Sequence, residues 1–209
     1  MVSDFVREYV EREIIPLYDS FDRAHDRTHV NTVIEQSAQL ATHFDVNYDM
    51  VYLIAAFHDT GLGRGRELHH IYSSEMLMAD KFVAEHFDAA ERKVMAEAIE
   101  DHRASSKHDP RTIYGKIVAE ADRVISVDIT LERTVQYGLK HYPKLDMEAH
   151  YVRFEAHLQD KYARGGYVKL WIPYSDNARN IEQLRAVIED KPLLRKRFLE
   201  IYDREYLAK

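Results

Sequence analysis

The sequence contains no cysteine. This absence excludes disulfide bonds, zinc–thiolate sites, iron–sulfur clusters and a cysteine nucleophile, so any metal ion must bind nitrogen and oxygen ligands. Glycine and proline are scarce, with seven and five residues among 209, which argues against a turn-rich β fold. Long apolar runs are lacking as well, and residues 1–22 mix charged with apolar side chains. We therefore expect neither a signal peptide nor a membrane span, and the cytoplasm is the simplest location.

The chain has a formal net charge of −7. Nucleic-acid backbones are bound mainly by lysine and arginine, so this charge argues against a surface for a nucleic-acid duplex. A small anion is still compatible if its site supplies local positive charge. With 209 residues, 45% of them hydrophobic, the chain can bury one sizeable core, and we expect a single domain. Whether it forms a homodimer stays open.

Apolar residues recur with a period near 3.6 through most of the sequence, which predicts an all-α fold. We expect the segment around residues 162–174 to be a short hairpin or a packed loop, and Ser175 or Asp176 to cap the helix that follows. The predicted helices cover residues 2–17, 28–44, 48–59, 67–86, 88–102, 111–128, 130–140, 145–163, 177–189 and 192–206.

Four predicted helices each turn an imidazole or a carboxylate toward the interior, at helical spacing from apolar residues: His29, His58, His102 and Asp122. A lone histidine on an apolar face is usually a hydrogen-bonded core residue. A buried carboxylate is costlier, because its charge needs a cation or a strong set of donors. An ion pair of Asp122 with Arg123 is disfavoured, since adjacent helical positions point about 100° apart. Together these residues favour a shared cation.

His58 and Asp59 stand next to each other at the end of an apolar helix, just before Gly61. Neighbouring helical positions diverge, so His58 can bind one metal ion while Asp59 reaches a second or bridges the two. This arrangement is typical of a binuclear centre.

The ordered set His29, His58-Asp59 and Asp122 resembles the pattern of the HD-domain superfamily of metal-dependent phosphohydrolases. The flanking phrases of this chain, HDRTHV and GKIVAEADR, are similar to those of the family as well. The likeness covers about residues 20–130.

The resemblance implies an HD-domain-like helical bundle at about residues 20–130, followed by a C-terminal helical extension at about residues 131–209, all within the single domain 1–209. Two-metal members carry further histidines between the His-Asp pair and the last aspartate. Here His102 is the better candidate, and His69 is slightly preferred to His70 because small serines follow it at the family's spacing. The expected metal ligands are then His29, His58, Asp59, His69, His70, His102 and Asp122.

Imidazole and carboxylate ligands suit two divalent ions of manganese, iron, cobalt, nickel, zinc or magnesium, although several histidines weigh against magnesium alone. We expect a metal-dependent phosphohydrolase that uses metal-activated water to cleave a phosphoester or phosphoanhydride of a small molecule, with a nucleotide as the expected substrate.

His58 and Asp59 are the expected catalytic residues, and Asp59 either bridges the ions or accepts a proton. The expected phosphate contacts are Arg64 and Arg66 and, as weaker candidates, Arg103 and Lys116; simple solvent exposure is the alternative for all four.

Two other functions are compatible with the same residues. Mixed-valent di-iron oxygenases have a similar scaffold and a similar histidine and aspartate set. A non-catalytic helical module that holds a structural metal ion or a signalling nucleotide is the third interpretation. Ligand identity alone does not separate these classes.

Overall fold

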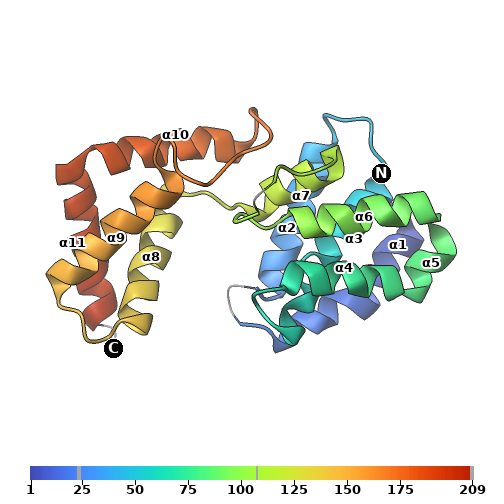
Figure 1. The fold of residues 1–209 in the computed structure, drawn as a ribbon, viewed down its shortest axis with the longest axis horizontal. Coiled ribbons are helices and arrows are strands. Elements are labelled where there is room, and N and C mark those ends of the chain that lie inside the picture. The colour runs from blue at the N-terminus through green and yellow to red at the C-terminus, as the bar shows by residue number, and fades with distance from the viewer. Residues whose placement is uncertain (23–24, 107, 208–209) are drawn as a thin grey trace. The chain divides into compact units, whose positions relative to one another are not determined.

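The computed structural model describes residues 1–22, 25–106 and 108–207 (Figure 1). These residues form helices and connecting loops, and none of them lies in a strand. The prediction of an all-α fold is confirmed. The chain divides into two compact units, Met1–Arg123 and Val124–Lys209, and each has its own hydrophobic core. That all 209 residues act as a single domain stays a prediction.

The described residues of the first unit form seven α-helices and three short helices of other pitch. Their bounds are α1 (Asp4–Tyr9), the π-helical η1 (Val10–Ile14), the 3-10 helix η2 (Ile15–Ser20), α2 (Arg27–Ala41), α3 (Tyr48–Phe57), the 3-10 helix η3 (Thr60–Arg64), α4 (His69–Ala79), α5 (Lys81–His86), α6 (Ala89–Asp101) and α7 (Ile113–Asp122).

Helix α3 is the central helix of the first unit. Every residue from Met50 to Phe57 is buried, and α3 packs against α2, α6 and α7. Such an all-round apolar helix is stable only where other helices cover it. The Asn47 side chain caps its start by accepting from two backbone N–H groups. Because this buried helix ends at Phe57, the next two residues, His58 and Asp59, also lie in the interior.

Helix α2 begins close to the end of α3. Its cap is Asp26, whose Oδ1 accepts from the N–H groups of Thr28 and His29 at 2.9 and 3.1 Å. An aspartate in this position satisfies backbone donors that have no partner within the helix. His29 is thereby fixed in the first turn of α2.

Two of the predicted helices end earlier in the structure than the sequence pattern predicts. The single helix expected over residues 67–86 breaks at Asp80, whose backbone is extended and whose side chain accepts from the Val83 N–H at 3.0 Å, so that α5 starts afresh. The helix expected over residues 111–128 stops at Asp122. The backbone of Ile125 instead forms hydrogen bonds with asparagine side chains of a later helix.

The second unit consists of α8 (Val127–His141), α9 (Met147–Tyr162), α10 (Asp176–Glu189) and α11 (Lys191–Leu207). Its core is partly aromatic, with the rings of Phe154 and Phe198 at a centroid distance of 5.2 Å. The segment before α10 is a packed loop rather than a hairpin, with Val168 and Ile172 buried. Of the two expected caps, Ser175 is the one that accepts from the backbone of α10.

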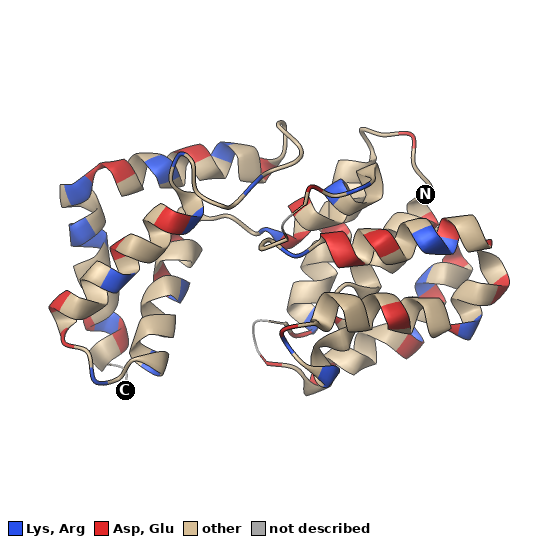
Figure 2. Ribbon diagram, viewed as in Figure 1, with Lys and Arg blue, Asp and Glu red and all other residues tan. Residues whose placement is uncertain are grey.

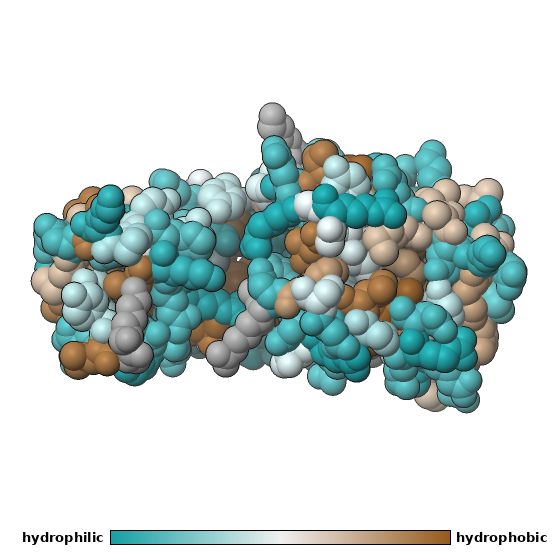
Figure 3. All heavy atoms as spheres, turned by 90° about the horizontal axis from the view of Figure 1, so that it is seen from below, coloured by the Kyte–Doolittle hydropathy of each residue, from teal (hydrophilic) through white to brown (hydrophobic). Residues whose placement is uncertain are grey.

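Charge is unevenly divided along the chain. Acidic residues outnumber basic ones in Met1–Arg123, whereas the two kinds are nearly balanced in Val124–Lys209 (Figure 2). On the face drawn in Figure 3, hydrophobic residues appear as separate groups between hydrophilic ones. Among the described residues, no helix combines the length and the apolar character that a bilayer crossing requires.

We expect Leu53→Ala to lower the free energy of unfolding by about 2–5 kcal/mol, because it leaves a cavity at a fully buried position of α3. Met78→Ala is the matched control, since Met78 is exposed on α4, and should change stability by less than about 0.5 kcal/mol. Urea titration followed by circular dichroism measures both. A change below about 1 kcal/mol in Leu53→Ala would contradict the packing described for α3.

Candidate metal centre

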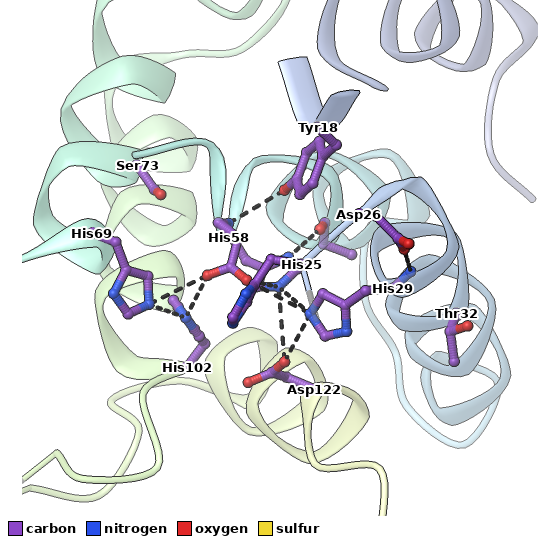
Figure 4. Close-up of polar contacts among 12 residues, drawn as sticks. Tyr18, His25, Asp26, His29, Thr32, His58, His69, Ser73, His102 and Asp122 are labelled. Carbon is purple, nitrogen blue, oxygen red and sulfur yellow. Dashed lines mark hydrogen bonds and ion pairs between the residues drawn. The ribbon is translucent and has the colours of Figure 1, made fainter. Parts of the chain in front are cut away.

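Six side chains from five parts of the first unit converge on one point (Figure 4). They come from the first turn of α2, the end of α3 and the residue after it, the start of α4, the end of α6 and the end of α7. In chain order they are His29, His58, Asp59, His69, His102 and Asp122. Each belongs to the predicted ligand set. The structure therefore brings together residues that lie up to 93 positions apart, as the difference between 29 and 122 shows.

Asp59 lies in the middle of this cluster. Its Oδ2 is 3.2 Å from Nε2 of His58 and 3.6 Å from Nε2 of His29. Its Oδ1 faces the other way, 3.3 Å from Nε2 of His69 and 3.5 Å from Nε2 of His102. The two carboxylate oxygens thus serve two different pairs of histidines. Each group of one carboxylate and two imidazoles could hold a metal ion.

Asp122 joins the first of these groups. Its Oδ1 lies 3.3 Å from Nε2 of His29 and 3.8 Å from Nε2 of His58. The first group therefore offers four side chains, His29, His58, Asp59 and Asp122, and the second offers three, Asp59, His69 and His102. We call them the four-ligand position and the three-ligand position.

Backbone carbonyls orient three of the imidazoles. His58, His69 and His102 each donate from Nδ1 to the carbonyl oxygen three residues earlier, at 2.7, 2.7 and 2.6 Å. A hydrogen bond at one ring nitrogen fixes the tautomer and leaves the other nitrogen as the ligand atom. Nε2 of all three rings is consequently the atom presented to the cluster.

This arrangement fits a metal ion because the facing nitrogens have the separation of two ligands on one ion. Nε2 of His69 and Nε2 of His102 are 3.1 Å apart, and in the neutral rings both carry lone pairs there. Nε2 of His29 and Nε2 of His58 are similarly close, at 3.2 Å. Ligands at about 2.0–2.2 Å from a divalent transition metal lie about 3.0–3.5 Å from each other. The separations match this spacing, so each pair of imidazoles could bind one cation.

The carboxylates and imidazoles shift each other's pKa values. Burial works to raise the pKa of Asp59, but the imidazoles, His58 first, hold it well below its usual range. For His102, burial works to lower the pKa, yet the hydrogen bond to Asp59 raises it. The pKa of His29 also rises, to about 9, because its contacts with Asp122 and Asp59 outweigh burial.

The raised pKa of His29 has a consequence for the metal-free protein. Because about 9 lies above the ordinary value of 6.5, protonation of His29 stabilises the fold fully below about pH 6.5, and this contribution is lost as the pH rises through 9. The neighbouring imidazole pair behaves differently: burial and the charge of His102 lower the pKa of His69 to about 4. The metal-free centre therefore holds a proton on His29 near neutral pH.

Tyr18 contacts the backbone beside the cluster, and no motif in the sequence singles it out. This residue of η2 is fully buried, and its hydroxyl donates to the carbonyl of Ala56 at 2.8 Å while accepting from the Asp59 N–H at 3.3 Å. It follows Ile14 at helical spacing on the inward face of the N-terminal segment, which indicates burial but not its hydrogen-bond partners. Tyr18 ties the end of α3 to the N-terminal segment.

His70 is not among the side chains that meet at the cluster. It neighbours His69, with ring centroids 5.6 Å apart, but neither of the two groups includes it. The first turn of α4 directs consecutive residues to different sides, and His69 is the one directed at Asp59. Between the two alternatives that the sequence left open, the geometry selects His69.

The four predicted phosphate contacts lie outside the cluster. Arg64 and Arg66 are largely exposed and pair with Glu75 and Asp22 at 3.6 and 3.5 Å. Arg103 donates from Nη1 to the carbonyl of Glu67 at 2.5 Å, and Lys116 is partly buried on α7. Their part in substrate binding stays a prediction.

We expect Tyr18→Phe to weaken metal binding by about 10-fold or more, because loss of a supporting hydrogen bond loosens a ligand-bearing segment. Isothermal titration calorimetry with Mn²⁺ measures the affinity. Tyr52→Phe is the control, since Tyr52 is a buried tyrosine of α3 outside the cluster. Equal affinities in wild type and Tyr18→Phe would show that Asp59 needs no such support.

Metal binding at pH 7.5 should release on the order of one proton, because His29 must lose its proton before Nε2 can act as a ligand. The apparent affinity should accordingly rise as the pH is raised toward 9. Calorimetry in buffers with different ionisation enthalpies counts the protons. An observed enthalpy that is independent of the buffer would be inconsistent with a protonated His29.

The HD domain family matches residues 27–126. Neither the curated proteins nor the solved structures give a match. The matched segment contains every side chain of the cluster, in the order His, His-Asp, Asp with two further histidines between. HD domains bind divalent metal ions, and the two groups of histidine and aspartate side chains could hold them. Residues 27–126 are therefore identified as an HD domain, the domain of a superfamily of metal-dependent hydrolases.

Proposed function

We propose that this protein is a metal-dependent phosphohydrolase that cleaves a phosphoester or phosphoanhydride bond of a small molecule, with a nucleotide as the favoured substrate. The proposal rests on the HD domain identified at residues 27–126 and on the geometry at Asp59. Its two oxygens face two separate pairs of imidazoles. A carboxylate shared in this way is suited to bridge two divalent ions.

The chain supplies four ligands to one metal position and three to the other. His29, His58, Asp59 and Asp122 would hold one ion, whereas Asp59, His69 and His102 would hold the other. When bound, divalent ions of this kind activate a water molecule and neutralise charge on a phosphoryl oxygen. The three-ligand position would leave more coordination sites open to the substrate, because fewer side chains would fill it.

Proton transfer in this centre falls to the aspartates. Hydrolysis adds water across a P–O bond, so that a proton leaves the attacking water and one reaches the departing oxygen. Both Asp59 oxygens already face imidazoles, which agrees with a bridging role. The Asp122 side chain is 23% exposed, against 5% for Asp59, and can therefore reach a water molecule more easily.

An acidic unit can bind an anion only where positive charge is present at the binding site. Acidic residues predominate in Met1–Arg123, so the positive charge for a phosphate has to be local. We propose that the metal ions provide most of it. The exposed side chains of Arg64, at the end of η3, and of Arg66, just after it, would contact the more distant phosphate oxygens. The partner in this proposal is a small phosphorylated molecule.

Asp59→Asn should abolish phosphate release from nucleotides and simple phosphomonoesters assayed with Mn²⁺, Co²⁺ or Mg²⁺. The variant keeps the shape of the side chain but removes the charge between the two ions, and a loss of about 10³-fold or more is expected. His86→Gln is the control, because His86 lies at the exposed end of α5. Elemental analysis and circular dichroism establish metal content and folding in both variants.

The same assay separates the competing functions. Phosphate release that needs metal but not oxygen supports the hydrolase. Oxygen consumption with an organic substrate, together with an iron paramagnetic signal, would support the di-iron oxygenase instead. A nucleotide that binds but is never consumed, combined with a lower melting temperature after metal removal, would indicate a non-catalytic module.

A further inference from the structure

Gly61 packs against α4 more closely than any residue with a side chain could. It is buried two residues after Asp59, and its N–H donates to Oγ of the fully buried Ser73 at 2.8 Å. A Cβ at this position would lie 2.5 Å from the backbone nitrogen of Ser73 and 2.7 Å from Cβ of Tyr72, and would collide with the carbonyl oxygen of His69. These are mostly backbone atoms, so no side-chain rotation relieves the clash. Any substituent at residue 61 has to push α4 away.

This contact determines where His69 lies. Gly61 follows Asp59 by two residues, and the atoms it touches belong to the first turns of α4, which carry His69. The Asp59 Oδ1 to His69 Nε2 distance of 3.3 Å is therefore set by how closely the two segments approach. A displacement of α4 by about 1 Å would take Nε2 outside the about 2.0–2.2 Å ligand distance that a metal ion requires.

The four-ligand position does not depend on α4. Its histidines come from α2 and the end of α3, and its second carboxylate comes from α7. Helix α2 packs on α3 and α7, which keeps these ligands together. Moving α4 would therefore disrupt the three-ligand position, while the ligands of the four-ligand position would stay together.

We propose that Gly61, together with Ser73, is the positioning element that creates the three-ligand position, so that a methyl group at residue 61 converts a two-ion centre into a one-ion centre. This inference rests on the proposed metal centre and specifies which residues make it binuclear. Gly61 and Ser73 bind no metal themselves; they act by holding His69 in place.

The test compares Gly61→Ala with Gly63→Ala. Gly63 lies on the same short helix η3, but a Cβ there would meet only a ring carbon of Phe21 at 3.7 Å, an ordinary contact. Calorimetric titration with Mn²⁺ and elemental analysis count the bound ions, and electron paramagnetic resonance detects magnetic coupling between two of them. Wild type and Gly63→Ala should bind two coupled ions. Gly61→Ala should bind the first ion normally and the second about 10–100-fold more weakly, without coupling.

Ser73→Ala is the milder second variant. It removes only the hydroxyl that accepts the Gly61 N–H, and should weaken the second ion alone by about 10-fold. Circular dichroism and thermal unfolding show whether each variant folds. If Gly61→Ala does not fold, the result for Ser73→Ala decides the proposal.

The outcomes distinguish this inference from the proposed function. A folded Gly61→Ala that binds two coupled ions with wild-type affinities would overturn it, and so would an unchanged second-ion affinity in Ser73→Ala. A wild-type protein that binds one ion would refute the three-ligand position and this inference with it. A wild-type protein that binds none would refute the metal centre on which the proposed function depends.

Discussion

The centre of the first unit is organised around a carboxylate that is almost completely buried. Asp59 is 5% exposed at its side chain, and an isolated charge in such a place costs several kcal/mol. Four imidazoles surround it, and in the metal-free protein the proton on His29, whose pKa is raised to about 9, compensates part of that cost. Divalent ions would take over the same role with more charge. The buried carboxylate is thus the reason why histidines from separate helices have to meet.

The helix ends place these ligands more precisely than the helix interiors could. His29 stands in the first turn after the Asp26 cap, His58 follows the last residue of α3, and His102 follows α6. At a helix end the last carbonyls lack partners within the helix. The imidazole of His58 uses such a carbonyl, at Ala55, as the acceptor for Nδ1. That of His102 donates to the carbonyl of Ile99, which also accepts from the backbone N–H of His102. Local helix chemistry and ligand orientation therefore have the same origin.

Residues that belong to neither ligand group hold the metal ligands in place. Tyr18 holds the backbone of Asp59 from one side, and Gly61 brings α4 against it from the other. Neither residue has chemistry of its own to offer a metal ion or a phosphate. Both act by fixing distances, which is how supporting residues usually affect metal sites.

The sequence by itself determined the all-α fold and the ordered set of His29, His58, Asp59, His102 and Asp122, because helical periodicity and polar residues on apolar faces are local properties of the chain. It did not determine whether His69 or His70 reaches the centre, since one helical position changes the direction of a side chain by about 100°. It also missed the break at Asp80, where a side-chain cap outweighs a continuous apolar pattern. Only the tertiary structure decided how the six ligands divide into two groups around Asp59, because that division depends on distances between helices far apart in the sequence.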